Sequence, residues 1–303
     1  MSLAANVALR RSAGEVVRAY VELTKPRIIA LLLITTVPSM ILAEGGMPSG
    51  WLILATLLGG TVAAGGANAL NQYFDRDIDE VMARTRRRPL PNHRVAPVNA
   101  FAFAVILAVA SFAWLTAMVN LLAAALSLGA LLFYVLVYTL WLKRRTPQNI
   151  VIGGAAGAAP ALVGWAAVTG RVDLPAVVLF LVVFLWTPPH FWALSLRYRK
   201  DYEAAGVPML PVVAGIAETT RQSLVYAVLT VAASIALIPV SDVGPVYAVA
   251  AGLLGAWFVA DAVRLHRSDG RAAMAMTLFR HSILYLGLLF GAVAIDTLAR
   301  AGA

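Results

Sequence analysis

The chain has 303 residues, of which 61% are hydrophobic and 13% are charged. An ordinary soluble domain is about 25% charged, so this composition excludes a typical soluble protein and indicates an integral membrane protein. The sequence contains no cysteine, which excludes disulfides, thiolate metal sites and cysteine nucleophiles. The formal charge of +9 alone would suit nucleic acid, but the basic residues lie between apolar runs. That distribution favours membrane lipid and anionic substrates as partners, with no nucleic acid.

Apolar runs, taken in chain order, predict an all-α polytopic membrane protein with about nine transmembrane helices. Residues 1–24 are expected to form an N-terminal cytoplasmic segment with an interfacial helix, and residues 25–303 a single membrane domain. No apolar core precedes a cleavage site, so no signal peptide is expected. Two long polar loops are expected at residues 75–98 and 197–220. The expected spans are residues 28–43, 51–73, 99–119, 121–142, 149–168, 174–196, 222–240, 245–263 and 281–298.

The basic residues predict the orientation of the chain in the membrane. All of the 24 Lys and Arg residues except Arg171 and Arg300 fall on the side of the N-terminus. The positive-inside rule therefore places the N-terminus and both long loops in the cytoplasm and the C-terminus outside. We expect the protein in the bacterial cytoplasmic membrane, with its active site facing the cytoplasm.

The stretch that follows the second span carries Asn71, Asp75 and Asp79 at four-residue steps. If the helix continues, each step drifts by only about 40°, so the three side chains share one face and Asp77 points the opposite way. One amide and two carboxylates on one face suit a hard cation such as Mg²⁺ that also binds a substrate phosphate. The alternative is an acidic helix end in cytosolic water, although carboxylates at that end oppose the helix macrodipole unless something compensates them.

Arginines follow this motif closely. Arg84 and Arg88 are spaced to lie on one helical face, and guanidinium groups bind phosphate or carboxylate oxygens in pairs. For Arg86 and Arg87, membrane topology and ligand binding explain the charge equally well, because cytoplasmic loops are commonly basic.

A second group begins at His190, within the sixth apolar run. Ionisable groups inside a membrane are costly, so His190 is a functional candidate, with a helix–helix hydrogen bond as the alternative. Asp201 follows after very nearly three helical turns, so both would face one cavity if the helix persists, with Arg197 close to that face. Arg199 and Lys200 are also explained by topology. Two acidic centres on one membrane side indicate paired sites across a central cavity, where a diphosphate between them would need Mg²⁺.

The spacing of Asn71, Asp75 and Asp79 resembles the first aspartate-rich motif of the intramembrane aromatic prenyltransferases. The longer stretches NQYFDRDIDEVMARTRRRPLP and TPPHFWALSLRYRKDYEAAGVPMLPVVAG are similar to the heme-directed subfamily, the protoheme IX farnesyltransferases. In the second motif His190 and Arg197 stand where the wider superfamily carries acids, a change that the heme-directed members share. His93 stands where that subfamily usually has glycine.

The resemblance implies a Mg²⁺-dependent transfer of farnesyl from farnesyl diphosphate to a vinyl carbon of heme b, giving heme O. It assigns catalysis to Asp75, Asp79, Lys200 and Asp201, and metal binding to Asn71, Asp75, Asp79 and Asp201. It implies substrate binding by Arg84, Arg88, His190, Arg197, Tyr198, Arg199 and Tyr202. Within that set, Lys200, Arg199 and Tyr198 would hold diphosphate oxygens, and Arg84 and Arg88 diphosphate or heme propionates. His190 would ligate iron or orient the porphyrin, and a downstream heme-modifying enzyme is a further expected partner.

Two other functions stay open at the level of sequence. A related enzyme would prenylate a quinone precursor instead of heme. A secondary transporter for an anionic metabolite would show inverted repeats and interrupted helices at the midplane, whereas the polar groups here cluster at one face.

Overall fold

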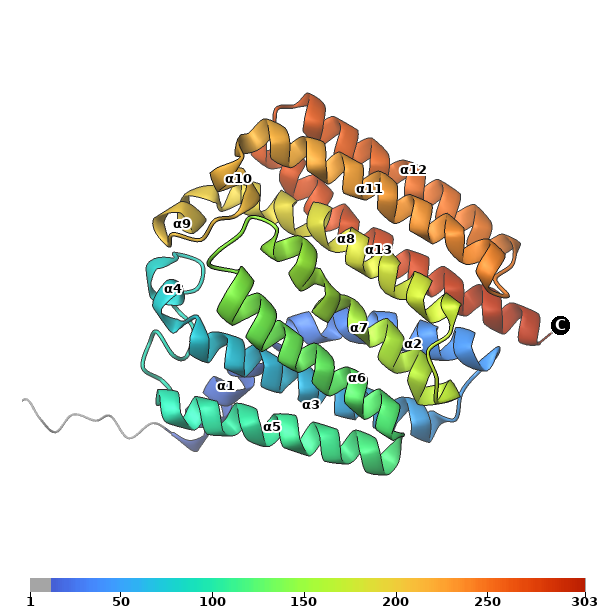
Figure 1. Ribbon diagram of the computed structural model, residues 1–303, viewed down its shortest axis with the longest axis horizontal. Coiled ribbons are helices and arrows are strands. Elements are labelled where there is room, and N and C mark those ends of the chain that lie inside the picture. The colour runs from blue at the N-terminus through green and yellow to red at the C-terminus, as the bar shows by residue number, and fades with distance from the viewer. Residues whose placement is uncertain (1–11, 303) are drawn as a thin grey trace, which may run out of the picture.

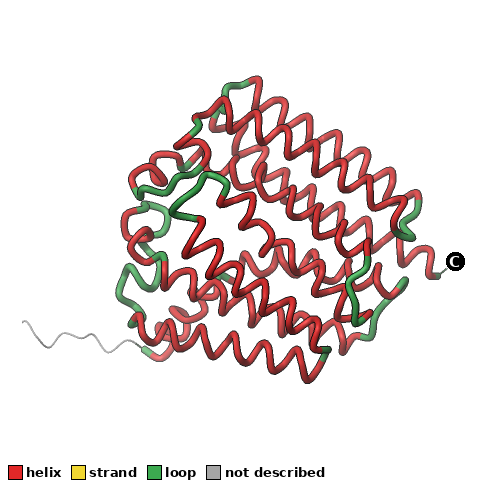
Figure 2. The backbone as a smooth tube through the Cα atoms, in the orientation of Figure 1, coloured by secondary structure: helices red, strands yellow, loops and turns green. Residues whose placement is uncertain are grey.

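The computed structural model of the protein describes residues 12–302, and over these residues the chain is helical with no strand (Figure 1). Eight helices in this part of the chain are long and apolar enough to cross a membrane, and a shorter apolar helix, Leu33–Glu44 within α2, packs against α7 and α13. Figure 2 shows the connecting loops gathered at the two ends of the long helices. The elements are α1 (Ala13–Thr24), α2 (Pro26–Glu44), α3 (Gly50–Phe74), α4 (Arg76–Val81), α5 (Pro97–Met118), α6 (Leu121–Leu132), the π-helix η2 (Phe133–Leu142), α7 (Asn149–Thr169), α8 (Leu174–Arg197), α9 (Arg199–Ala204), α10 (Leu210–Val213), α11 (Gly215–Val240), α12 (Pro245–Arg267) and α13 (Ala272–Ala301).

The helices begin and end where local chemistry predicts. Proline stands in the first turn of α2, α5, α8, α10 and α12, where its missing N–H leaves no hydrogen bond unmade. The side chains of Ser49 and Asn120 accept hydrogen bonds from Leu52 N and Ala123 N and so cap α3 and α6. Gly170, at a φ of 68°, ends α7 in the left-handed conformation that glycine adopts without strain.

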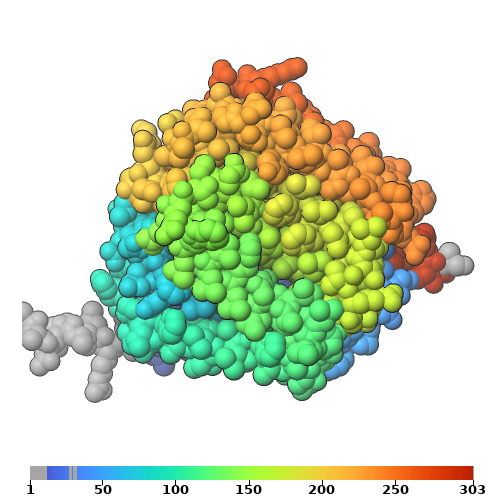
Figure 3. Space-filling view, viewed as in Figure 1, coloured from blue at the N-terminus to red at the C-terminus, as the bar shows by residue number. Residues whose placement is uncertain are grey.

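The long helices form two groups. In the first, α2, α3, α5, α6 and α7 contact one another in sequence and close a five-helix ring, drawn in blue to yellow-green in Figure 1. In the second, α8, α11, α12 and α13 close a four-helix ring, drawn in yellow to red. Contacts of α7 with α8 and of α2 with α13 join the rings, and Figure 3 shows one continuous surface across them.

The loops after α3 and α8 meet at one end of the molecule. A single apolar cluster there combines Ile78 and Met82 from the first loop region with Tyr202 and Met209 from the second, and Tyr138 of η2 joins it. The two motif-bearing helix ends therefore lie together, as the paired-site hypothesis requires.

Two expected boundaries need correction. Residues 197–220 are not one polar loop, because α9 and α10 lie within them and α11 already begins at Gly215. The last helix begins at Ala272, well before residue 281, because alanine and methionine extend it through the polar stretch around Arg280. His93 adopts a φ of 52°, so the loop keeps the left-handed turn that glycine would make more easily.

The N-terminal division stays a prediction, and residues 1–11 lie outside the described part of the chain. Within the described part, α1 packs on α3. Gln72 Nε2 donates to Leu23 O over 2.9 Å, and Asn68 Nδ2 donates to Thr24 O over 2.9 Å. These bonds hold the end of α1 against the five-helix ring.

Candidate active site

The three oxygen-bearing residues of the first motif share one buried face. Helix α3 ends at Phe74, yet Asp75 N donates to Asn71 O over 2.9 Å and Asp79 N donates to Asp75 O over 2.8 Å. The helical spacing thus continues across the junction into α4. Asn71, Asp75 and Asp79 are 4%, 0% and 2% exposed, whereas the Asp77 side chain is 60% exposed.

A cation lies on each of these three residues. Lys25 Nζ donates to Asn71 Oδ1 over 2.8 Å, and Lys143 Nζ donates to Asp75 Oδ2 over 2.5 Å. Arg88 Nη1 lies 2.8 and 2.7 Å from the two carboxylate oxygens of Asp79. This positive charge offsets the unfavourable interaction of carboxylates with the end of α3. Burial lowers the pKa of Lys25, because desolvation disfavours its charged form.

The π-helix η2 brings two of the site residues into place. Thr139 Oγ1 donates to Tyr134 O over 2.8 Å and accepts from Asn71 Nδ2 over 3.1 Å. Lys143 N donates to Tyr138 O over 2.8 Å, five residues back, which is the π-type spacing. Sequence reasoning missed Lys143 and Lys25. In the sequence both count only among the basic residues on the side of the N-terminus.

Charged neighbours surround this buried set. Arg144 makes a two-nitrogen fork with Asp77, with both N···O distances 2.7 Å, and this hydrogen bonding lowers the pKa of Asp77. Arg94 pairs with Glu22 of α1, and that hydrogen bond lowers the pKa of the Glu22 carboxyl.

The second motif is interrupted. Helix α8 ends at Arg197, and Tyr198, at φ −106° and ψ 23°, separates it from α9. The predicted alignment of His190 with Asp201 required one continuous helix, and the chain does not form one here. Tyr202 is 2% exposed in the apolar cluster beside α4, and the guanidinium of Arg84 lies 5.8 Å from the centre of the Tyr198 ring.

The charged members of this motif are less constrained. Arg197 and Lys200 are exposed. Asp201 is half-buried. The Nε of Arg199 is buried and has no hydrogen-bond partner among the described residues. Their substrate roles remain predictions.

His190 lies between α8 and α13. Its Nδ1 is 2.7 Å from Ser282 Oγ, and its ring lies between those of Trp186 and Phe279 at centroid distances of 4.2 and 4.7 Å. The helix–helix hydrogen bond considered at the level of sequence is thus present, and Nε2 is the nitrogen left for any ligand.

The donor set of the first motif fits a hard divalent cation. Asp75 Oδ1 is buried and has no hydrogen-bond partner among the described residues, an unusual state for a carboxylate oxygen. Amide and carboxylate oxygens are the ligands that Mg²⁺ prefers. Within residues 12–302 no three His, Asp or Glu side chains already form a metal cluster, so Asn71 would have to complete the set.

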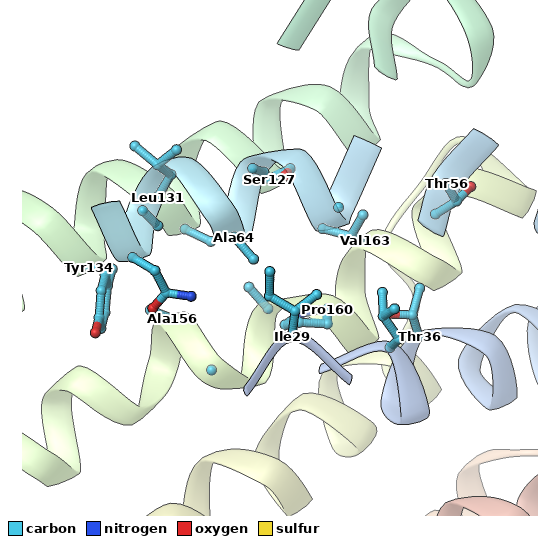
Figure 4. A pocket seen from close by; sticks show the side chains of 18 residues that line it. Ile29, Thr36, Thr56, Ala64, Ser127, Leu131, Tyr134, Ala156, Pro160 and Val163 are labelled. Carbon is cyan, nitrogen blue, oxygen red and sulfur yellow. The ribbon is translucent and has the colours of Figure 1, made fainter. Parts of the chain in front are cut away.

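An apolar cavity of about 190 Å³ opens beside these residues, inside the five-helix ring (Figure 4). Asn68 and Tyr134 line it near Asn71, and Thr36, Thr56 and Val163 line its far part. Small residues of α3 and α7 make up much of the wall between. A polar cluster with cations at the mouth of an apolar chamber suits a substrate with an anionic head and a hydrocarbon tail.

Known proteins share this architecture. A protein named protoheme IX farnesyltransferase from Clavibacter michiganensis subsp. michiganensis is 58% identical over 283 residues, which cover 93% of this chain and 92% of the relative. A solved digeranylgeranylglyceryl phosphate synthase superposes with a TM-score of 0.77 at 18% identity, covering 94% of this chain and 99% of that one. A UbiA homolog from Archaeoglobus fulgidus, bound to DMAPP and Mg²⁺, gives a TM-score of 0.61 at 16% identity, covering 91% and 99%.

The sequence pattern of the UbiA prenyltransferase family matches residues 32–284, which is most of the chain. The resemblance inferred from two motifs is therefore confirmed over residues 32–284, and the chain is an integral membrane protein that belongs to the UbiA prenyltransferase family.

Proposed function

We propose that this chain transfers the farnesyl group of farnesyl diphosphate to a vinyl carbon of heme b. The bond between the farnesyl C1 carbon and diphosphate breaks, C1 bonds to the vinyl carbon, and the hydroxyl of water adds to the neighbouring carbon as a proton is released. The products are heme O and diphosphate. The active site faces the cytoplasm in this proposal, because the loops that carry it are the basic ones.

The observation that carries the proposal is the buried Asn71, Asp75 and Asp79 face with its three cations at the mouth of an apolar cavity. The 58% identical relative named for heme farnesylation supports heme over a quinone precursor as the acceptor. Membership of a prenyltransferase family argues against the transporter alternative.

The first motif binds the diphosphate end of the substrate. Asn71, Asp75 and Asp79, with Asp201 from the second motif, supply oxygen ligands for Mg²⁺. When bound, Mg²⁺ supplies positive charge that stabilises the departing diphosphate. Lys143 and Arg88 pair with the two carboxylates, and Lys25 donates to the amide oxygen of Asn71. All three side chains are therefore positioned to donate to phosphate oxygens.

The second motif completes the enclosure. Tyr198 and Tyr202 pack the end of α8 and α9 against the first motif, and the arginine Arg84 lies over the Tyr198 ring. Arg199 and Lys200 hold diphosphate oxygens, and Arg84 and Arg88 bind diphosphate or the heme propionates. Their fixed positive charge stabilises the negative charge that develops as the carbon–oxygen bond breaks.

The acceptor and the hydrocarbon tail use the rest of the site. Arg197 binds the acceptor, and His190 orients the porphyrin or ligates its iron through Nε2, since Ser282 occupies Nδ1. The apolar cavity holds the isoprenoid chain and keeps stray water from the reacting allylic carbon. Association with a downstream heme-modifying enzyme would give the product a direct route onward.

The test is turnover by the purified protein supplied with heme b, farnesyl diphosphate and Mg²⁺, read by mass spectrometry of the extracted heme. We expect heme O to appear and a chelator to stop its formation. Parallel reactions with hydroxybenzoate and naphthoate acceptors distinguish the alternative enzyme. Prenylated quinone precursor with unchanged heme would contradict the proposal, as would vesicle uptake of a metabolite without any covalent product.

A further inference from the structure

Glycines in the five-helix ring fall into two groups. At Gly59, Gly66 and Gly164 an added Cβ would meet atoms of a neighbouring helix at 2.4, 3.0 and 2.5 Å, so these glycines permit close helix packing. At Gly60 and Gly157 an added Cβ would meet nothing within 4 Å, and both line the cavity. Glycine is among the least favourable residues in a helix interior, and close packing does not explain it at these two positions.

The depth of these two glycines in the cavity follows from helix geometry. Gly60 lies eleven residues before Asn71 on α3, which places it about 16 Å along the helix axis from the polar mouth. Gly157 lies on α7, eight residues after Asn149 at the same end, or about 12 Å deep. The extended backbone of a fifteen-carbon isoprenoid reaches about this depth from a diphosphate at the mouth, whereas a ten-carbon chain stops short of it.

Larger side chains bound the cavity beyond this level. Thr56 follows Gly60 one turn deeper on the same face of α3, and Val163 lies one to two turns beyond Gly157 on α7. Val163 is 5% exposed and packs in an apolar cluster with Met40 and Ala123. Thr56 and Val163 therefore close the deep end of the cavity, which limits its length.

We propose that Gly60 and Gly157 set the length of the isoprenoid that the chain accepts, by leaving open the space that the terminal isoprene unit of a fifteen-carbon chain fills. Val163 and Thr56 exclude longer chains at the same site. The inference rests on the proposed function, because it places the diphosphate at Asn71 and Asp75.

The experiment compares kcat/KM for geranyl, farnesyl and geranylgeranyl diphosphates, with heme b as acceptor, in the wild type, Gly60→Leu and Gly157→Leu. At both positions the Cβ of the new side chain meets nothing within 4 Å. We expect the preference for farnesyl over geranyl to fall about 10- to 100-fold, the range for a side chain that blocks part of an apolar pocket. The matched control is Gly252→Leu on α12, where an added Cβ also meets nothing within 4 Å but the glycine is exposed and lies outside the cavity.

The opposite change tests the deep end of the cavity. Val163→Ala should raise the relative use of geranylgeranyl diphosphate by about tenfold. Gly60→Ala fills less space than leucine and should shift the preference in the same direction by a smaller factor, which keeps the test available if a leucine variant fails to fold. Competition by nonhydrolysable geranyl and farnesyl analogues for binding gives the same ranking without turnover.

An unchanged farnesyl-to-geranyl ratio in folded Gly60 and Gly157 variants would overturn the inference, and so would an equal shift in Gly252→Leu. A wild type that makes no farnesylated heme at all would instead refute the proposed function. The two failures are therefore distinguishable in one set of reactions.

Discussion

The two rings of helices differ in what fills them. The four-helix ring is packed with large side chains, among them Tyr247, Phe258, Tyr285 and Phe290, all 0% exposed. At its centre the five-helix ring has a cavity with many glycine and alanine residues in its wall. Small residues let helices approach closely in lipid, so the cavity stays open because contacts elsewhere in the ring hold these helices apart. The packed ring is thus a frame, and the hollow ring is the part whose interior can admit the isoprenoid chain.

Buried acids differ between the rings in the same way. In the four-helix ring Asp261 is paired through both oxygens, with Arg264 at 2.8 Å and His281 at 2.6 Å. Asp296 accepts from the backbone of Gly244 at 2.5 Å and caps the start of α12. In the five-helix ring Asp75 keeps one oxygen without a hydrogen bond among the described residues, with the Arg144 guanidinium 4.0 Å from it. An unsatisfied buried oxygen is costly in a purely structural role, which marks the hollow ring as the site of ligand binding.

The largest expected effect is on this unsatisfied acid. Asp75→Asn should lower kcat by at least about 10³-fold while leaving membrane insertion intact, because an amide binds a divalent cation and the leaving diphosphate far less well. Asp79→Asn should behave alike. The measurement is heme O formation by purified variants, normalised to folded protein.

The control lies two residues away. Asp77→Asn removes a carboxylate from the same segment, but its side chain is 60% exposed and faces Arg144 at the surface. Turnover in this variant should stay near that of the wild type. Equal losses in the Asp75 and Asp77 variants would contradict the metal assignment, because general negative charge would then explain both.

The second expected effect compares the loss of stability from a substitution in the packed four-helix ring with that from a substitution in the cavity wall. Phe258→Ala in the four-helix ring removes a fully buried ring that stacks on Tyr285 at 4.7 Å and should destabilise the protein by about 3–5 kcal/mol. Leu131→Ala in the cavity wall should cost less, because one side of Leu131 already faces empty space and makes no contacts there. Thermal unfolding in detergent gives both values, and a larger loss for Leu131→Ala would show that the cavity is filled in solution.

Sequence reasoning could predict the helices and the first motif for a clear physical reason. Long apolar runs have few alternatives in a membrane, and four-residue spacing fixes Asn71, Asp75 and Asp79 on one face. The cations could not be assigned in this way. Lys143 reaches Asp75 across 68 residues of chain and depends on the π-helix before it, and Lys25 depends on a left-handed backbone with φ 54°.

The second motif shows the limit of spacing arguments. The alignment of His190 with Asp201 required one continuous helix, but the chain turns at Tyr198. Tyr202 then packs into the apolar cluster beside α4. His190 finds its partner, Ser282, 92 residues further along the chain. No local period predicts such contacts.

The third expected effect tests the cations of the hollow ring. Lys143→Gln should lower kcat/KM for farnesyl diphosphate by about 10- to 100-fold, because hydrogen bonds to charged groups contribute about 1.5–3 kcal/mol. Arg144→Gln is the matched control, since Arg144 is adjacent, 40% exposed and bound mainly to Asp77. Similar losses in both variants would contradict a specific role for Lys143 and indicate that its charge serves only the orientation of the chain in the membrane.

The smallest expected effect concerns the contact between α1 and the loop before α5 at the mouth of the hollow ring. The hydrogen bond from Arg94 holds the pKa of Glu22 below its ordinary value of 4.5, so the pair stabilises the fold above that pH and the stabilisation is lost as pH falls through the lower folded pKa. The side chains of Arg94 and Glu22 are 30% and 34% exposed, so their ion pair stabilises the fold by about 1 kcal/mol or less. Glu22→Gln should therefore lower the melting temperature slightly at pH 7, and the difference from wild type should vanish in acid.

Glu80→Gln on α4 provides the control, because it removes the charge of an exposed carboxylate outside the contact between Arg94 and Glu22. Its melting temperature should follow that of the wild type at every pH. If the melting temperatures of Glu22→Gln and the wild type still differ well below pH 4.5, the Glu22 side chain acts by packing α1 rather than by its charge. In that case the mouth of the hollow ring would be held by the same kind of contact as the packed ring, and the contrast between the two would be confined to their interiors.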